Sequence, residues 1–415
     1  MNKLRVRVYN VLFGDAILIS VPDAAPGESP ALRHILIDVG NSLVTEGGED
    51  SVFKKVVADV LTELAGQPLD LYIMTHEHMD HVQGLQYYQT KVLHGQPIKD
   101  KLQTRYAWLT RSAHPDYYTP GTPGYHPNAK ERKRLEQVFL DEAREYFQAA
   151  PDEQTDWVRG LLAINNPRKT DDCVSILRDL APAHTHYIYR GMDLNGTHPF
   201  REATFEIWAP EEDTATYYGQ FHPVAFGAVA GIGPSGKPAL ARVEPPRGVD
   251  AGAFYNLLDW RRRGYGDNLL SIDSAANNTS IVFCLNWRGW SLLFPGDAEV
   301  RSWKEINKRS LVKSVHFLKI SHHGSITGMP PEDVLGELLK ADGTRRYVAL
   351  SAYPDLEKQA RGEQEWTYPE VPRQEVLGKL KSRADLQQTI QVADGGYIEY
   401  AFAGGTSNVT IGTSG

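Results

Sequence analysis

The chain has 415 residues and a mass of 46.4 kDa, enough for two or three domains or for one large α/β domain with insertions. Hydrophobic residues make up 41% and charged residues 23%, as in ordinary soluble globular proteins. The net charge of −8 argues against a protein that binds nucleic acid with its whole surface, but a local basic rim remains compatible with it.

The N-terminal residues alternate between polar and apolar types like a strand, and Gly14 and Asp15 then interrupt the apolar run, so we expect no signal peptide. No apolar stretch approaches the roughly 20 residues that cross a bilayer. The two cysteines, Cys173 and Cys284, lie far apart in apolar contexts and are expected to be core thiols. These features predict a cytoplasmic protein in a reducing compartment.

The first region, residues 1–84, is rich in short β-branched runs separated by Gly, Asp and Pro. Residues 51–64 carry apolar side chains at a helical period, and an apolar run follows at 69–74. The order predicted for this region is strands at 6–9, 16–21 and 34–39, a helix at 51–64, and a strand at 69–74.

The predicted strand at 69–74 leads into the motif Thr75-His76-Glu77-His78-Met79-Asp80-His81. Imidazole and carboxylate groups hold borderline divalent metals at neutral pH. A ligand set at the end of a rigid strand is held in place while its loop stays open to substrate. The motif therefore predicts a metal site.

The middle region, residues 85–267, is rich in Tyr, His, Pro and Gly and has turn clusters at 115–127, 165–172 and 231–246. One amphipathic helix is predicted at 128–150. We interpret this region as an insertion that forms a lid or a specificity element at the mouth of the metal site. Its basic clusters, at 130–134 and 261–263, are either solvated faces or a local basic rim.

The third region, residues 268–415, returns to strands. The elements predicted here are strands at 279–286, 290–294, 315–320 and 347–351, helices at 331–340 and 373–383, and closing strands at 388–392 and 396–402. The Gly-, Ser- and Thr-rich tail, 403–415, is expected to be frayed.

Two of these strands also end in candidate ligands. Asp297 follows the apolar run 292–294 after a glycine, and His322 and His323 follow 317–320. Alone, the first is typical of a turn and the second of an exposed histidine pair. Because sites assemble at strand ends in α/β sheets, the three sources together predict two metals about 3.5–4 Å apart.

The motif His76-x-His78-x-Asp80-His81 resembles the signature of the metallo-β-lactamase fold, an αββα sandwich with a metal site on one edge. More narrowly, the chain is similar to the soluble metallohydrolase domain of competence DNA-uptake proteins of the ComEC type. The matching segments, in the expected order over about half of the chain, are 14–19, 36–40, 277–280, 295–297, 318–325, 348–351 and 372–377.

The chain departs from that pattern in three ways. It lacks the membrane helices of the uptake proteins, so transport is not implied. It has His78 where those proteins usually have Asp, which makes the site richer in imidazole. It has Val371 before Pro372 where many relatives have His, which puts a substrate-binding role of that position in doubt.

The resemblance implies that His76 and His78 hold one metal and that Asp80 and His81 hold the other, with Asp297 as a bridge. His323 would complete the second metal because it precedes Gly324, and His322 would face the substrate and stabilise an anionic oxygen; the reverse assignment stays open. A third ligand of the first metal would come from Asn278 or from a histidine of the middle region: His114, His126, His184, His186 or His222.

The expected cofactors are two divalent metal ions, Zn²⁺ by ligand type or Mn²⁺ by the resemblance. They would lower the pKa of a bound water from 15.7 towards about 7 and so supply a hydroxide. Asp80 or Asp297 would take the residual proton. Asp38 is placed either to support a ligand histidine or to form a turn, and Lys319 either to pair with a phosphate or to be solvated.

The leading functional hypothesis is a metal-dependent phosphodiesterase, most plausibly a nuclease acting on nucleic acid or on a small phosphodiester. The alternatives are a hydrolase of a small ester, lactone, thioester or nucleotide, and a non-catalytic metal protein whose middle region, 85–267, recruits a protein partner. Aromatic residues of the middle region would either stack bases or form its core; they are Tyr87, Tyr88, Trp108, Tyr117, Tyr118, Tyr217 and Tyr218.

Overall fold

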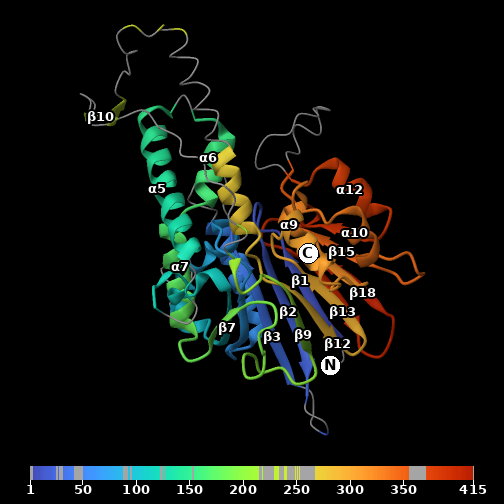
Figure 1. Cartoon of the computed structure of the whole chain (residues 1–415). Coiled ribbons are helices and arrows are strands. Elements are labelled where there is room, and N and C mark those ends of the chain that lie inside the picture. The colour runs from blue at the N-terminus through green and yellow to red at the C-terminus, as the bar shows by residue number, and fades with distance from the viewer. Residues whose placement is uncertain are drawn as a thin grey trace.

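The structure is a computed structural model. It describes residues 3–24, 27, 31–41, 50–86, 92–93, 96–121, 125, 127–151, 154–214, 217, 229–232, 238–240, 248, 250, 252, 267–354 and 371–414. These residues form a mixed α/β fold with two large mixed sheets, which confirms the predicted α/β class (Figure 1). No helix among them is long and apolar enough to cross a membrane.

The first sheet has eight strands in the order β18-β17-β1-β2-β3-β4-β7-β8. Its strands are antiparallel from β18 to β3 and parallel from β3 to β8. Their bounds are β1 Lys3–Tyr9, β2 Ala16–Asp23, β3 Ala31–Val39, β4 Leu69–Met74, β7 Thr104–Thr110, β8 Thr185–Ile188, β17 Tyr397–Ala403 and β18 Val409–Thr413.

The second sheet has six strands in the order β16-β15-β14-β13-β12-β9, antiparallel from β9 to β13 and parallel from β13 to β16. Their bounds are β9 Thr204–Ala209, β12 Val282–Trp287, β13 Trp290–Phe294, β14 Phe317–Lys319, β15 Tyr347–Leu350 and β16 Asp385–Gln388. Two small two-stranded sheets pair β5 Val92–Leu93 with β6 Gln96–Pro97, and β10 Val229–Ile232 with β11 Pro238–Leu240.

The two large sheets pack face to face over a shared apolar core. Strand β2 shows why residues 16–19 are all apolar: Ile17 and Ile19 enter the core between the sheets, whereas Ala16 and Leu18 face a second core under helices. A strand that is buried on both faces carries an uninterrupted apolar run rather than an alternating one. The sheets therefore form the two inner layers of the molecule.

Helices cover the outer face of each sheet. The first sheet packs against α1 Asp50–Leu64, α2 Met79–Val82 and α7 Pro167–Leu180, and the second against α9 Val300–Lys308, α10 Glu332–Leu338 and α12 Gln374–Lys381. Short helical elements lie at α4 Ile98–Lys101, η1 Arg111–Ala113, η2 Pro115–Tyr118, η5 Ser321–Gly324 and η6 Thr389–Gln391.

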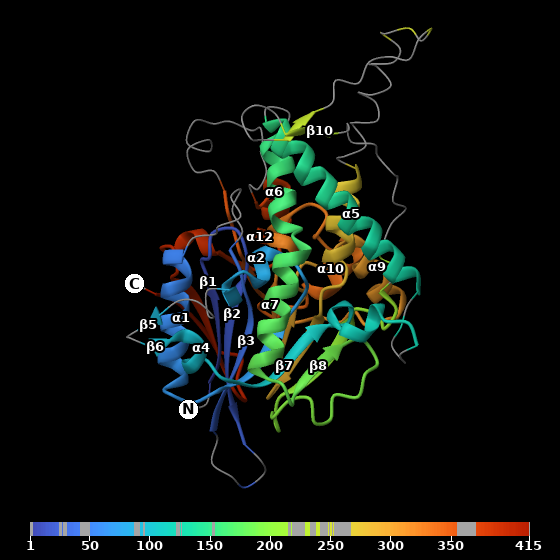
Figure 2. The same cartoon turned by 90° about the vertical axis from the view of Figure 1, so that its left-hand side faces the viewer.

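A separate small core lies among helices beside the sheets (Figure 2). It joins α5 Pro127–Ala149, α6 Asp156–Ile164 and a helix at 267–277. Phe139 and Phe147 of α5 pack there with Leu161 of α6 and Leu269 of the third helix. The predicted helix at 128–150 is thus confirmed, and most of its apolar face is buried, whereas Val138 is exposed.

The middle region, 85–267, contributes more to the two large sheets than its interpretation as an insertion implies, because β7, β8 and β9 all come from it. The cluster at 165–172 was expected to be a turn, but α7 begins there. Asn166 is the N-cap of α7, and Pro167 occupies its first turn, where a proline needs no hydrogen-bond partner.

Two predictions for the C-terminal part are wrong. The strand expected at 388–392 lies instead at β16, and η6 follows it. The tail expected to be frayed forms β18, which pairs with β17 from Val409 to Thr413. Strands at 6–9, 16–21, 34–39, 69–74, 290–294 and 347–351 and the helix at 51–64 are confirmed to within a few residues.

Candidate metal centre

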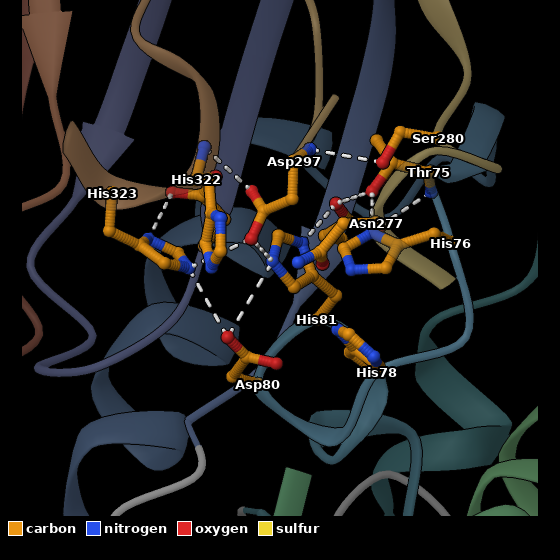
Figure 3. Close-up of polar contacts among 12 residues, drawn as sticks. Thr75, His76, His78, Asp80, His81, Asn277, Ser280, Asp297, His322 and His323 are labelled. Atoms are coloured by element: carbon orange, nitrogen blue, oxygen red, sulfur yellow. Dashed lines mark hydrogen bonds and ion pairs between the residues drawn. The ribbon is translucent and has the colours of Figure 1, made fainter. Parts of the chain in front are cut away.

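The predicted ligands meet where strands of both large sheets end. β4 of the first sheet leads into His76, whereas β13 and β14 of the second sheet lead into Asp297 and η5. Figure 3 shows the side chains of these segments turned towards one another. Four buried residues form what we call the four-residue group, whose ligand atoms lie within 4.8 Å of one another: Asp80, His81, Asp297 and His323.

Two histidines face two carboxylates within this group. The Nε2 atom of His81 lies 3.2 Å from Asp297 Oδ2 and 3.7 Å from Asp80 Oδ2. The Nε2 atom of His323 lies 3.2 Å from Asp80 Oδ2 and 3.4 Å from Asp297 Oδ2. Of the two adjacent histidines, the structure therefore places His323 with the expected ligands of the second metal.

Burial and charge act in opposite directions on these groups. Burial alone would raise the pKa of Asp297, but His81 and His323 hold that pKa well below its ordinary value. Burial would lower the pKa of His81, yet Asp297, Asp80 and Asp38 raise that pKa well above the ordinary value. The carboxylates thus attract positive charge, and a divalent cation would compete with protons for the same atoms.

Two buried atoms in the site lack a hydrogen-bond partner among the described residues: His76 Nε2 and Asp80 Oδ1. Such an atom costs about 1–3 kcal/mol when it stays unpaired. The donor set, imidazole nitrogen and carboxylate oxygen, is the one that Zn²⁺ and Mn²⁺ accept. The residues present therefore fit a divalent metal.

Asp38 orients two of the histidines. Its Oδ2 accepts hydrogen bonds from His81 Nδ1 at 2.8 Å and from the Thr75 hydroxyl at 2.6 Å. The Thr75 oxygen in turn lies 3.1 Å from His76 Nδ1. Both rings therefore have Nδ1 engaged and Nε2 left for the centre, which agrees with the expected supporting role of Asp38.

Two glycines let the backbone of the first sheet approach the motif. A Cβ atom on Gly40 would lie 2.0 Å from the carbonyl carbon of Asp80, and one on Gly14 would lie 2.5 Å from its carbonyl oxygen. Any other residue would push this segment away. Gly14, which precedes β2, and Gly40, which follows β3, therefore set the position of Asp80 and His81.

His78 lies beside this group rather than in it. Its ring centroid is 4.7 Å from that of His76, and its Nε2 atom is 3.0 Å from Asn165 Oδ1. His76 and His78 thus lie next to each other, as the resemblance implies for the first metal.

A second group, here called the His322 group, contains Asp273, Glu299 and His322, with ligand atoms within 4.8 Å of one another. Burial would lower the pKa of His322, but its hydrogen bond with Glu299, at 3.2 Å, and the charge of Asp297 raise that pKa to about 9. His322 is therefore cationic near neutral pH. The sequence analysis missed Asp273 and Glu299, because neither has a distinctive spacing; only the position of Glu299, two residues after Asp297, offers a hint.

Two further candidate site residues, Asn278 and Lys319, make structural contacts instead. Asn278 was expected to stand in as a ligand, but its Oδ1 accepts hydrogen bonds from the amide and hydroxyl of Ser302, and its amide nitrogen donates to Ser274 O. Lys319 was considered as a phosphate partner, but its ammonium is buried and donates to Asp15 Oδ2 at 2.7 Å. Asn278 thus anchors the start of α9, and Lys319 forms an internal ion pair.

The histidines of the middle region do not complete the centre where they are described. His114 caps η2 through Asp116, and His184 and His186 pack near Tyr106. His126 and His222 lie outside the described residues, as do Tyr87, Tyr88, Tyr218 and the basic cluster 261–263. Trp108, Tyr117 and Tyr217 are buried, so among the aromatic candidates described only Tyr118 lines a cavity beside the site.

Two connected hollows lie beside His78. A cavity of about 80 Å³ reaches His78 and Asn165 and carries three carboxylates, on Glu77, Glu136 and Asp171. A groove of about 500 Å³ shares Glu77, Tyr118 and Lys133 with it and is also lined by basic residues: Lys130, Arg134 and Arg178. The predicted basic cluster at 130–134 therefore contributes to a groove that shares lining residues with the cavity at His78.

No protein-family model matches the chain, and no curated protein sequence matches it.

Proposed function

We propose that the protein is a metal-dependent hydrolase of the metallo-β-lactamase type, resembling the ComEC-type metallohydrolases, and that its substrate is a phosphodiester. One observation carries this proposal: residues hundreds of positions apart meet as a buried set of imidazoles and carboxylates, with unpaired atoms facing the centre. The two face-to-face sheets with helices outside, and the order of the motifs, support the family assignment.

In this proposal, His76 and His78 hold one divalent ion, and the four-residue group holds the other. Such ions, when bound, make a water more acidic and neutralise charge that develops on the substrate. Asp38 keeps His76 and His81 in the orientation that leaves Nε2 free. Asp80 Oδ1, which lacks a protein partner among the described residues, is the atom best placed to accept a proton from the attacking water.

His322 supplies positive charge to the substrate side. It is the least buried histidine of the cluster, with 19% of its side chain exposed, and Glu299 holds it as an imidazolium. A fixed cation of this kind stabilises charge that grows on a phosphoryl oxygen. The expected role of His322 towards an anionic substrate therefore remains part of the proposal.

The basic groove favours a phosphodiester. Lys130, Lys133 and Arg134 line it and lie on one helix, α5. A local positive surface on a chain of net charge −8 attracts phosphate groups without making the whole protein a nucleic-acid binder.

The inner cavity favours the alternative, a small ester, lactone, thioester or nucleotide. It measures only about 80 Å³ and carries Glu77, Glu136 and Asp171 against Lys133, an excess of negative charge that would repel a second phosphate. A substrate with a small uncharged or hydrogen-bond-donating group beside the scissile bond would fit it better than a continuous polyanion.

The proposal is tested with purified protein after metal analysis. Bis-p-nitrophenyl phosphate, single-stranded DNA and a panel of small esters are offered with Mn²⁺ or Zn²⁺, before and after chelation. We expect chelator-sensitive phosphodiester cleavage that Asp80→Asn abolishes. Ester turnover without phosphodiester cleavage would favour the alternative, and bound metal without any turnover would favour the non-catalytic interaction protein.

A further inference from the structure

The ring of His78 is held by a residue from the middle region. Asn165, the C-cap of α6, places its side-chain oxygen 3.0 Å from His78 Nε2. Both side chains are buried, and the segment around Asn165 lies outside the motifs that resemble known metallohydrolases. The contact therefore joins the metal motif to a part of the chain whose role the sequence leaves open.

The amide of Asn165 has only one possible orientation. Its nitrogen donates to Leu161 O and to Asp273 Oδ1, both at 3.0 Å, so the oxygen faces His78. The other oxygen of Asp273 accepts from Asn277 Nδ2 at 3.2 Å, and Arg144 fixes the backbone by donating to Asn165 O at 2.6 Å. These contacts fix both the side chain and the backbone of Asn165.

The direction of these hydrogen bonds sets the tautomer of His78. Because Asn165 Oδ1 can only accept, His78 Nε2 must carry the proton, and the lone pair of the neutral ring lies on Nδ1. His76 and His81 have the opposite arrangement, since their Nδ1 atoms contact Thr75 and Asp38. His76 and His81 thus have their Nε2 atoms free of these contacts, whereas His78 has its Nδ1 atom free.

We propose that Asn165 and Asp273 are positioning residues that make His78 a metal ligand through Nδ1, so that the middle region completes the first metal site. This inference rests on the proposed function only for the presence of the metal. It explains how the first metal can be held although the chain lacks a third histidine at Asn278. It also predicts that the two metals differ in their dependence on the middle region.

The experiment compares two variants with a matched control. Asn165→Leu keeps the side-chain volume but removes the hydrogen bond to His78. Asp273→Asn keeps an amide oxygen that accepts from Asn165 and changes only the contact with Asn277, whose amide nitrogen also donates to Glu299 Oε1. The control, Asn166→Ala, changes a neighbour that lines the same cavity but caps α7 through the Lys169 amide instead.

Metal binding is measured by Zn²⁺ calorimetry and by the visible spectrum of the Co²⁺ form. Asn165→Leu should weaken the first metal about 10- to 100-fold and leave the second unchanged. Asp273→Asn should lie nearer to the wild type, and Asn166→Ala should match it. Nitrogen-15 NMR of histidine-labelled wild-type protein, with and without Zn²⁺, should show His78 protonated at Nε2.

Protonation of His78 at Nδ1 in the zinc form would overturn the inference, as would two wild-type affinities in a folded Asn165→Leu protein. If that variant does not fold, the NMR result and Asp273→Asn decide. Two bound metals without hydrolysis of any substrate would overturn the proposed function and leave this inference standing. A wild-type protein that binds no metal would overturn both.

Discussion

At the scale of single residues, one carboxylate fixes the rotation of two histidines. Asp38 contacts His81 directly and His76 through Thr75. It also adopts a left-handed backbone conformation, with φ of 50°, which Asn tolerates better than most residues. Replacing Asp38 by Asn is therefore a mild change for the backbone and a specific one for the site.

We expect Asp38→Asn to lower metal affinity about 10- to 100-fold with little change in circular dichroism, because a neutral amide no longer holds both rings. Metal content after dialysis measures the effect. Asp70→Asn is the control, since Asp70 is also a buried carboxylate but bonds Arg33 and the His34 amide away from the centre. Equal metal loss in both variants would contradict the specific role of Asp38.

The buried ion pair between Lys319 and Asp15 is a second feature at the scale of single residues. Both side chains are almost fully buried, and Asp15 also accepts a hydrogen bond from Ser351. Asp15 Oδ1 lies 3.9 Å from His323 Nδ1, so the ion pair lies next to the ring of His323 and supports its position. Removal of one partner would leave a buried charge without compensation.

Lys319→Met should therefore destabilise the protein by about 3–5 kcal/mol, whereas the double variant Asp15→Asn/Lys319→Met should lose less. Urea unfolding of both proteins tests this. If Lys319 instead served a phosphate, Lys319→Met would keep its stability and lose only substrate affinity.

At the scale of elements, a three-way contact ties α1 to the first sheet. Glu63 of α1 accepts from Arg5 and Arg7 of β1, each at 2.6 Å, and Arg7 also bonds Glu399 of β17. Burial alone would raise the pKa of Glu63, but Arg7 and Arg5 lower it below the ordinary value.

Because the folded state holds Glu63 ionised, its contribution to stability is present above the ordinary pKa of about 4.3 and is lost as the pH falls through the lowered pKa. Glu63→Gln should cost about 1–2 kcal/mol at pH 7, and its stability should converge with that of the wild type only when the pH has fallen below the lowered pKa of Glu63. Glu375→Gln, which breaks an exposed pair with Lys379 on α12, should not change stability measurably at either pH. A loss for Glu63→Gln that is the same at both pH values would contradict this origin.

The sequence predicted best those elements that are buried on both faces. β2 and β4 are mostly apolar and fully buried, and the end of β4 leads into the candidate metal motif. β9 was missed because exposed polar residues, Thr204 and Glu206, alternate with its apolar ones near the sheet edge. β18 was missed because its Gly and Thr residues lie in a Gly-, Ser- and Thr-rich tail, and only pairing with β17 makes it a strand.

The residues of the candidate site also fall into those that a local sequence pattern reveals and those that it does not. A ligand at a strand end can be found from the local pattern, as for Asp297 and His323. Asn165 ends a helix and Asp273 lies within one, so neither position has a spacing that marks it. Likewise, the partner of Lys319 lies 304 residues away, and no local pattern connects the two.

At the scale of the whole molecule, the four-residue group joins the two sheets. Asp80 and His81 follow β4 of the first sheet, whereas Asp297 and His323 follow strands of the second. Between the two sheets, these four side chains contact one another as imidazole–carboxylate pairs. A bound metal would therefore act as a cross-link between halves that meet mainly through their apolar core.

Binding to the folded state alone stabilises it by about 2.7 kcal/mol when the free metal exceeds its dissociation constant 100-fold. Chelation should thus lower the unfolding temperature of the wild type by several degrees, and added Zn²⁺ or Mn²⁺ should restore it, as measured by calorimetry. In Asp297→Asn, which loses the carboxylate shared by both histidines of the group, the chelator should have a much smaller effect. An equal shift in both proteins would mean that the metal binds elsewhere, and no shift in the wild type would mean that the two sheets meet without one.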